Sequence, residues 1–188
     1  MAAPSAPGSR TLHEFQQQLS RRMQQARGSQ ASAQSFIAAS TGTRRWLFEL
    51  AHTAEMLPQA ELTPVPFTHP WYLGLINHRS QLTGVIDLDA FAGAPSVRWQ
   101  AGDRVLALSA ALPLRCAIRV AQAPAVVDRA RFRPAGTGQA AWCPQSFTDA
   151  DGLRWDRVDL PVLMATSAFL DIARRPAPAY FSGVMHGS

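Results

Sequence analysis

The chain has 188 residues, of which 47% are hydrophobic and 16% are charged, a composition typical of a folded globular protein. Its 18 basic residues are all arginine, and the lack of lysine excludes a Schiff-base lysine, a G-x-x-x-x-G-K-[ST] phosphate loop and a kinase-type catalytic lysine. The formal net charge is +5, but residues 1–34 carry +3 (four Arg, one Glu) and residues 35–188 carry +2 (14 Arg, 12 acidic residues). A nucleic-acid-binding protein concentrates basic residues on one element, so this spread argues against nucleic acid as the main partner.

The two cysteines, Cys116 and Cys143, are too few and too isolated for a disulfide framework or a zinc site. Residues 1–9 lack the charged and apolar regions of a signal peptide, and no run reaches the ~18 apolar residues of a membrane span. We therefore expect a cytoplasmic protein with no direct insertion into the membrane.

Residues 1–34 are predicted to form a flexible tail, one amphipathic helix and a linker. Thr11 and Glu14 make a capping box at the start of the helix, and Gly28 ends it. The apolar stripe of the helix consists of Leu12, Phe15, Leu19 and Met23. This stripe can pack against the chain's own domain or against a partner helix, and the sequence leaves both possibilities open.

Short apolar segments separated by turn residues follow, and they predict three β-hairpins. The hairpins pair residues 36–39 with 46–50, residues 74–77 with 82–88, and residues 104–108 with 114–120. In the last strand, the two-residue period places Cys116 on an apolar face and Arg115 and Arg119 on the opposite face. We therefore expect Cys116 to be a core residue and not a nucleophile.

A faint internal repeat indicates two similar all-β units. Residues 85–88 (Val-Ile-Asp-Leu) recur as residues 157–160 (Arg-Val-Asp-Leu), an offset of 72 residues between the two aspartates (159 minus 87). A hairpin signal precedes each copy and an apolar residue follows it, which predicts a short helical segment after each Asp-Leu pair.

No sequence pattern points to catalysis. The chain lacks H-E-x-x-H, C-x-x-C, G-x-S-x-G and G-x-G-x-x-G motifs, and its five histidines lack the spacing of metal ligands. Asp149, Asp151 and Gly152 resemble the start of a calcium loop, but the other ligands are missing and a β-turn is the better interpretation. We predict no enzyme activity and no catalytic, cofactor-binding or metal-binding residues.

The segment from Glu55 to Leu88 carries the clearest pattern. It contains Glu55-Met56-Leu57, then Gly74-Leu75-Ile76-Asn77-His78-Arg79-Ser80, then Val85-Ile86-Asp87-Leu88. This pattern resembles the CheW-like family of chemotaxis coupling proteins, in which a Glu-Ile precedes a hairpin reading G-x-x-N-x-R-G and then P-V-I-D-L. The resemblance extends loosely over residues 36–172, and the helix in front makes the chain most similar to the coupling proteins of type IV pilus twitching motility.

The resemblance implies an all-β fold of two SH3-like five-stranded β-barrels, preceded by the N-terminal amphipathic helix. Residues 35–172 would form the CheW-like domain and residues 173–188 a C-terminal tail. It also implies a non-catalytic scaffold that joins the cytoplasmic tip of a methyl-accepting receptor to the regulatory domain of a CheA-type histidine kinase. Two other hypotheses are an SH3-like nucleic-acid-binding module and an enzyme of unknown type.

Three residues match the family's partner-binding positions. Glu55 and Arg79 match the Glu and Arg beside an apolar groove between the two barrels, which in the family holds the receptor helix, and Asn77 matches the hairpin Asn. A Glu at a strand end and an Arg on a neighbouring hairpin can pair, which would orient the guanidinium toward a partner. For Asn77, stabilisation of the turn is the competing interpretation. Trp71 and Tyr72 are interpreted as packing residues and not as interface anchors.

Three positions depart from the family pattern. Ser80 replaces the usual turn glycine, so the turn either differs in geometry or holds Ser in a strained conformation. Gly84 replaces the usual proline, and Arg119 lies near a position where the family's second barrel has Asp. We expect these departures to affect partner contacts more than the fold.

Overall fold

The computed structural model describes residues 35–57, 60–100 and 103–173. The predicted tail, helix and linker of residues 1–34 lie outside the described residues, as does the C-terminal tail beyond residue 173. The first half of the described chain contains β1 (Ser35–Ser40), β2 (Arg45–Glu49), η2 (Leu50–His52), β3 (Thr53–Leu57), β4 (Tyr72–His78), β5 (Gln81–Ile86), α2 (Leu88–Phe91), β6 (Arg104–Leu108) and β7 (Cys116–Val120). The second half contains β8 (Ala125–Asp128), η3 (Arg129–Arg131), β9 (Arg133–Ala140), β10 (Cys143–Thr148), β11 (Arg154–Val158), α3 (Leu160–Ala165) and α4 (Ser167–Leu170).

All three predicted hairpins are confirmed. Strand β1 pairs with β2, β4 with β5, and β6 with β7, each in the antiparallel direction. A fourth hairpin, β10 with β11, encloses residues 149–152, where the sequence predicts a β-turn. Asp149 forms this turn by accepting hydrogen bonds from the backbone N–H groups of Asp151 and Leu153, at 3.0 and 2.9 Å.

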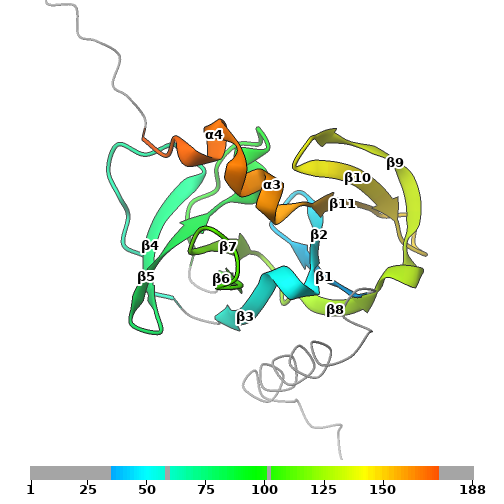
Figure 1. Cartoon of the computed structure of the whole chain (residues 1–188), viewed down its shortest axis with the longest axis horizontal. Helices are drawn as coiled ribbons and strands as arrows, with labels where there is room; N and C mark the ends of the chain where they lie inside the picture. The colour runs from blue at the N-terminus through cyan, green and yellow to red at the C-terminus, as the bar shows by residue number, and fades with distance from the viewer. Residues whose placement is uncertain (1–34, 58–59, 101–102, 174–188) are drawn as a thin grey trace, which may run out of the picture.

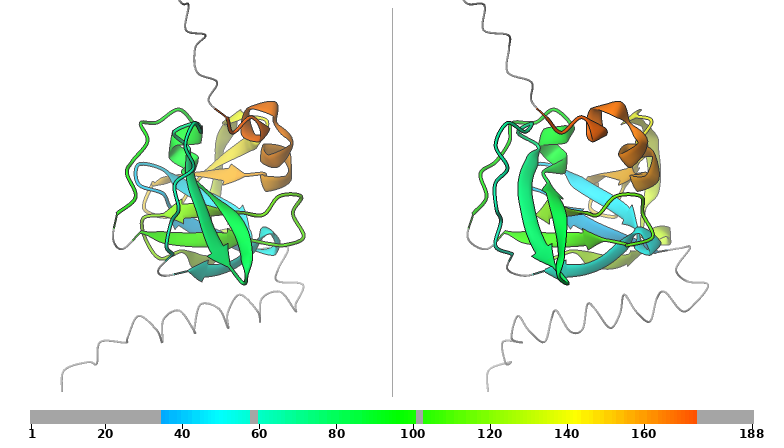
Figure 2. Two further views of the ribbon diagram at one scale, coloured as in Figure 1. Left: turned by 90° about the vertical axis from the view of Figure 1, so that its left-hand side faces the viewer. Right: turned by 60° about the vertical axis from the view of Figure 1, so that its left-hand side comes forward.

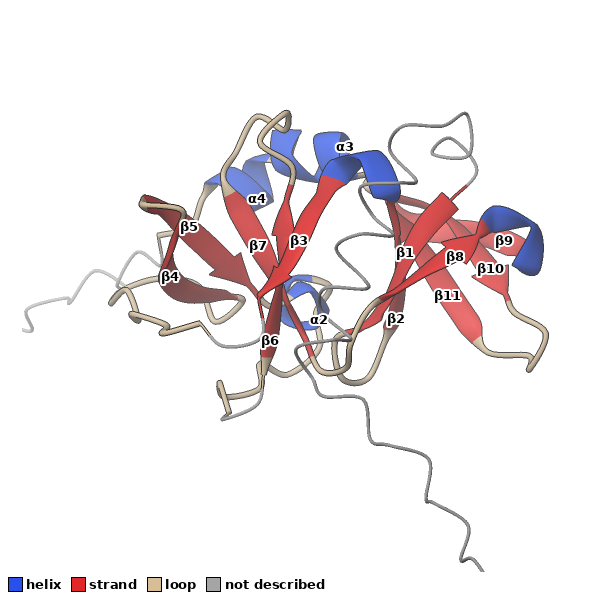
Figure 3. Ribbon diagram, turned by 90° about the horizontal axis from the view of Figure 1, so that it is seen from below, coloured by secondary structure: helices blue, strands red, loops and turns tan. Residues whose placement is uncertain are grey.

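The strands form two sheets that lie side by side, with α3 and α4 across the junction between them (Figures 1 and 3). Sheet A has the order β8-β1-β2-β11-β10-β9, and sheet B has the order β3-β6-β7-β5-β4. Each sheet contains one parallel pair, β2 with β11 in sheet A and β5 with β7 in sheet B. Sheet B has the expected five strands and sheet A has six, and no strand pairing in the described chain closes either sheet into a barrel.

Sheet A nevertheless curls strongly. Its two edge strands, β8 and β9, are consecutive in the chain and are joined only by the short η3. Because so short a link cannot cross the width of a flat sheet, the two edges must approach each other at that end. Figure 1 shows this curved connection between β8 and β9.

The apolar residues of each strand alternate between two cores. In β1, Phe36 and Ala38 enter a core enclosed by sheet A, whereas Ile37 and Ala39 enter a core shared by both sheets. In sheet B, Ala117 faces a core of that sheet's own, and Cys116 and Ile118 on the neighbouring positions of β7 face the shared core. Strands buried on both faces read as continuous apolar runs and not as alternating patterns.

The predicted internal repeat corresponds to a repeated structure. Asp87 follows β5 and accepts a hydrogen bond from the Ala90 N–H at the start of α2, and Asp159 follows β11 and accepts one from the Val162 N–H at the start of α3. In both copies the aspartate's own N–H donates to a tryptophan carbonyl at 2.8 Å, that of Trp71 or Trp142. The same strand, cap and helix therefore occur once in each half.

The burial of Arg119 corrects the prediction that β7 has one apolar face and one polar face. The sequence pattern puts Arg119 on the strand face opposite the core. In the structure Arg119 is only 5% exposed, because the second face of sheet B is also covered. Its guanidinium pairs with the Asp103 carboxylate through two hydrogen bonds, of 2.8 and 3.1 Å, and one amino group lies 3.7 Å from Asp87. The pairing supplies the partner that a buried charge needs.

Ser80 and Gly84 both have local explanations. Arg79 and Ser80 are the central residues of the β4–β5 turn, with φ angles of 53° and 61°, so Ser80 adopts the left-handed conformation that the family's glycine would favour. At Gly84, an added Cβ would lie 3.0 Å from the Tyr72 ring, which covers that position. The Gly84 N–H also donates to the Arg115 carbonyl, a bond that proline could not make.

Candidate functional site

The structure brings all three predicted partner-binding residues together. Glu55 lies on β3, Asn77 lies on β4, and Arg79 lies in the turn between β4 and β5. The three side chains line one open hollow of about 820 Å³ on sheet B. The hollow lies between the two edge strands of that sheet, β3 and β4, next to the hairpin seen at the lower left of Figure 1. It is lined only by sheet B strands and the segments that connect them, and so differs from the groove between the two barrels that the resemblance implies.

Glu55 and Arg79 form the predicted ion pair with a two-point geometry. The Arg79 Nε lies 3.0 Å from Glu55 Oε1, and Arg79 Nη2 donates to Glu55 Oε2 at 3.0 Å. The Glu55 side chain is 26% exposed and that of Arg79 is 74% exposed. The carboxylate therefore holds one edge of the guanidinium, and the rest of the guanidinium faces the solvent.

His78 is a member of this cluster that the sequence analysis did not identify. Its Nε2 contacts Glu55 Oε1, the same oxygen that Arg79 Nε reaches. Burial alone would raise the pKa of the Glu55 carboxyl, but the hydrogen bonds from His78 and Arg79 outweigh it and lower the pKa. In the sequence, the one indication that His78 belongs to this cluster is its position between the two motif residues Asn77 and Arg79.

Asn77 is exposed and lies opposite Leu82 in the register of β4 and β5. The turn itself is formed by Arg79 and Ser80, two and three residues further on. Asn77 lines the hollow, and its side chain forms no hydrogen bond with another residue of the described chain. This placement favours a contact role over the stabilisation of the turn.

The remaining wall of the hollow is largely apolar. Leu57, Leu75 and Leu82 line it, and Leu82 is 69% exposed, unusual for so large an apolar side chain. Glu61 adds a second carboxylate. An apolar surface bordered by Arg, Glu and Asn can bind a protein segment that has both apolar and charged side chains.

Trp71 and Tyr72 are packing residues, as expected. Trp71 is 8% exposed and stacks on Phe169 with ring centroids 5.4 Å apart, and it meets Phe91 edge-on at 5.2 Å. These rings belong to the shared core, so the space between the two sheets is filled by aromatic side chains at this point.

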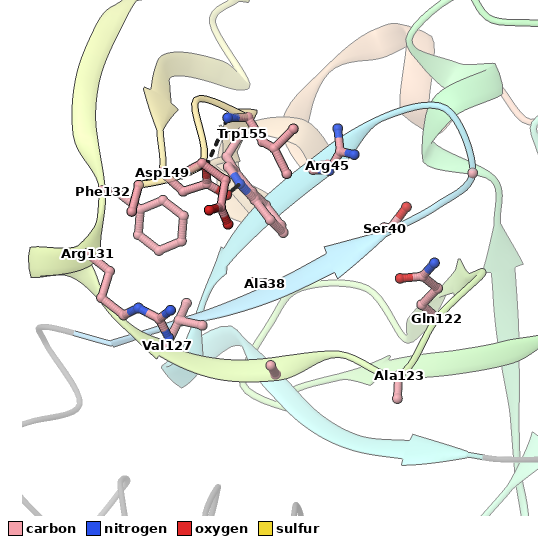
Figure 4. Close-up of a pocket in the computed structure, with 15 residues that line it drawn as sticks. Ala38, Ser40, Arg45, Gln122, Ala123, Val127, Arg131, Phe132, Asp149 and Trp155 are labelled. Atoms are coloured by element: carbon pink, nitrogen blue, oxygen red, sulfur yellow. Dashed lines mark hydrogen bonds between the residues drawn. The ribbon is translucent and has the colours of Figure 1, made fainter.

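A second hollow, of about 640 Å³, lies on sheet A, and the sequence analysis did not predict it (Figure 4). Its floor includes the small paired residues Ala38 and Ala125. Arg45 and Arg131 stand on different sides of it, as Figure 4 shows. Both carboxylate oxygens of the nearby Asp149 already accept hydrogen bonds: one from the N–H groups of the turn described above and one, at 2.8 Å, from Trp155 Nε1.

The side chains that could act as nucleophiles or metal ligands elsewhere in the described chain are either buried or far apart. Both cysteines are buried, and burial raises the pKa of the Cys116 thiol to about 12 and also raises that of Cys143. Among residues 35–57, 60–100 and 103–173, no three His, Cys, Asp or Glu side chains come together to hold a metal ion. No helix in this part of the chain is long and apolar enough to cross a membrane.

Comparisons with known proteins identify the family and the fold. Residues 35–148 match the family described as the CheW-like domain. Among solved structures, the chain is similar to the scaffolding protein TtCheW from Thermoanaerobacter tengcongensis, with a TM-score of 0.57 and 17% sequence identity over 72% of this chain and 94% of that chain. No curated protein sequence matches the chain.

Proposed function

The chain belongs to the CheW-like domain family, and from this membership we propose that it is a signal-transduction scaffold. In this proposal it couples the cytoplasmic tip of a methyl-accepting receptor to the regulatory domain of a CheA-type histidine kinase, and it acts in the cytoplasm by binding alone. The observation that carries the proposal is the two-point Glu55–Arg79 pair at the edge of an apolar hollow, on the residues that match the family's motif.

Binding without catalysis is consistent with the state of the reactive side chains. The thiol of Cys116 has a pKa of about 12 and is therefore not ionised near neutral pH. Two exposed polar groups at the hollow, the Arg79 guanidinium and the Asn77 amide, recognise partners well and are poor nucleophiles or bases.

Within the proposal, the hollow binds the receptor segment. A receptor helix would place apolar side chains against Leu57, Leu75 and Leu82, and a carboxylate against the free edge of Arg79. The kinase's regulatory domain would pack against a different part of the two sheets, as its likeness to the CheW-like fold suggests. The motif and the predicted helix of residues 1–34 resemble PilI, so we place the protein in type IV pilus twitching motility.

The test measures the binding of a soluble receptor-tip fragment and of the purified kinase regulatory domain. Arg79→Glu should weaken binding of the receptor fragment about tenfold or more, because the reversed charge repels both Glu55 and the partner's carboxylate. Circular dichroism should show that the variant stays folded, since Arg79 is exposed.

Two variants control this test. Arg98→Glu makes the same charge change at another exposed arginine, outside the hollow, and should leave binding unchanged. The double exchange Glu55→Arg with Arg79→Glu restores the pair but reverses its direction, and it should still fail to bind. Wild-type protein that binds neither the kinase domain nor the receptor fragment would refute the scaffold proposal.

A nucleic-acid-binding module is the second candidate, favoured by one observation. Arg129, Arg131 and Arg133 are exposed within five residues of η3 and β9, and no ion pair to another described residue is formed by them. A nucleic-acid complex held by these groups would weaken steeply with salt. Absence of a gel shift at low salt would exclude this candidate, whereas receptor, kinase and pilus-retraction genes beside the coding gene would favour the scaffold.

A further inference from the structure

His78 occupies the open position of the family's hairpin motif. The pattern N-x-R leaves the middle residue unspecified, and this chain has histidine there, at the last residue of β4. Its side chain is 17% exposed, and it lies on the wall common to two hollows, the one lined by Asn77 and another, of about 170 Å³, lined by Arg115. The motif residues on either side of it, Asn77 and Arg79, both line the first of these hollows.

The Glu55 carboxylate is shared between two donors. Oε1 meets both His78 Nε2 and Arg79 Nε, and Oε2 meets Arg79 Nη2. An ionised carboxylate can only accept hydrogen bonds, so His78 Nε2 carries the proton in this contact. A further proton on Nδ1 would make the imidazole a cation and the contact an ion pair.

The charges that face His78 otherwise cancel. Glu55 on β3 and Glu61 before β4 are opposed by Arg79 in the turn and Arg115 before β7. Cys116 on β7 is also close, but its thiol keeps its proton at neutral pH. One proton on His78 therefore changes the net charge of the cluster from zero to +1.

We propose that His78 is a positioning residue of the Glu55–Arg79 surface, and that its protonation strengthens the attraction of Arg79 for a carboxylate of the partner. When His78 is neutral, Glu55 neutralises Arg79. When His78 is a cation, it takes a share of the Glu55 charge, and more of the Arg79 charge is left for the partner. This inference rests on the proposed function, because the partner's carboxylate is that of the receptor segment.

The first test needs no partner. The Arg79 Nε resonance should shift in an NMR pH titration with the same midpoint as the His78 ring resonances, because both groups contact Glu55 Oε1. In His78→Gln that shift should disappear. An Arg79 resonance that does not follow the titration of His78 would overturn the inference, whatever the protein binds.

The second test measures binding of the receptor-tip fragment at pH 6 and pH 8. Wild-type protein should bind about threefold to tenfold more tightly at pH 6, the effect of one added charge at close range near a surface. His78→Gln and His78→Leu should show no such difference, and His69→Gln, which changes a histidine outside both hollows, should keep it. Equal pH dependence in wild type and His78 variants would overturn the inference and leave the scaffold function intact, whereas failure to bind at either pH would count against the function.

Discussion

At the scale of single residues, Asp89 connects the two sheets. It lies in α2, at the end of the sheet B hairpin, and is 4% exposed. In the loop between β1 and β2 of sheet A, Thr41 Oγ1 and the N–H and hydroxyl of Thr43, both at 3.0 Å, donate to its carboxylate, and Trp46 Nε1 of β2 donates at 2.9 Å. Burial alone would raise the Asp89 pKa, but these donors lower it below the ordinary value of 3.8.

Replacement of Asp89 by Ala should lower the free energy of unfolding by about 3 kcal/mol at pH 7, because the buried Thr41 hydroxyl and both Thr43 donors lose a charged acceptor that links the two sheets. Asp89 has a lower pKa in the folded than in the unfolded state, so its stabilisation is complete above pH 3.8 and is lost as the pH falls through the folded-state pKa. Urea unfolding at pH 7 and pH 3 measures the difference between wild type and variant, which should shrink at pH 3. The exposed Asp151→Ala should change stability by less than about 0.5 kcal/mol.

At the scale of elements, the repeated unit of strand, aspartate cap and short helix differs between its two copies in burial. Asp159 is half-buried and caps α3 only. Asp87 is 1% exposed, caps α2, accepts from the Val97 N–H at 3.4 Å, and has Arg119 nearby. The same residue type therefore has a local role in one copy and a tertiary role in the other.

This difference predicts unequal effects of one substitution. Asp159→Ala should cost about 1 kcal/mol, the usual effect of losing an N-cap, and Asp159→Asn should be nearly neutral because Asn caps as well as Asp. Asp87→Ala should cost about 3 kcal/mol or more, since it also removes a charge near the buried Arg119. Equal losses in the two alanine variants, measured by urea unfolding, would contradict this account.

At the scale of the whole molecule, one hydrophobic core joins the two sheets and the short helices α2 and α4. Trp46 of β2, Ile118 of β7, Phe91 of α2 and Phe169 of α4 all belong to the shared core. Figure 2 shows the helices of the C-terminal part covering the region where the two sheets meet. Each sheet therefore has a smaller core of its own on one face and shares this larger core with the other sheet on the opposite face.

Phe169→Ala should therefore destabilise both sheets together. Phe169 is 4% exposed, and the cavity left by a buried phenylalanine costs about 3–5 kcal/mol. Hydrogen exchange should show equal losses of protection at Phe48 in sheet A and at Ile118 in sheet B. Leu170→Ala, at the neighbouring residue of the same helix, removes a side chain that is 55% exposed and should have little effect. Loss of protection in one sheet alone would contradict the single shared core.

Features that depend on local sequence were predictable. Turn residues between apolar runs predicted the three hairpins, and the match of Glu55, Asn77 and Arg79 to the family's motif indicated a shared site. Contacts that depend on long-range register could not be predicted. The parallel pairing of β2 with β11, for example, joins residues far apart in the chain. The role of His78 required knowing that β3 and β4 bring it to Glu55, and the burial of Arg119 required knowing that both faces of sheet B are covered.

The order of the strands along the chain has a consequence for synthesis on the ribosome. Sheet B is built from one continuous stretch, β3 to β7, whereas sheet A combines β1 and β2 with strands made much later. Glu49, the last residue of β2, can pair with Arg157 only after another 108 residues have been made, which at a translation rate of 5–20 residues per second takes roughly 5–20 seconds. During this delay sheet B can complete its pairing, while the β1–β2 hairpin still exposes the apolar side chains that sheet A will later cover. The nascent chain is therefore most open to aggregation or chaperone binding at its first hairpin.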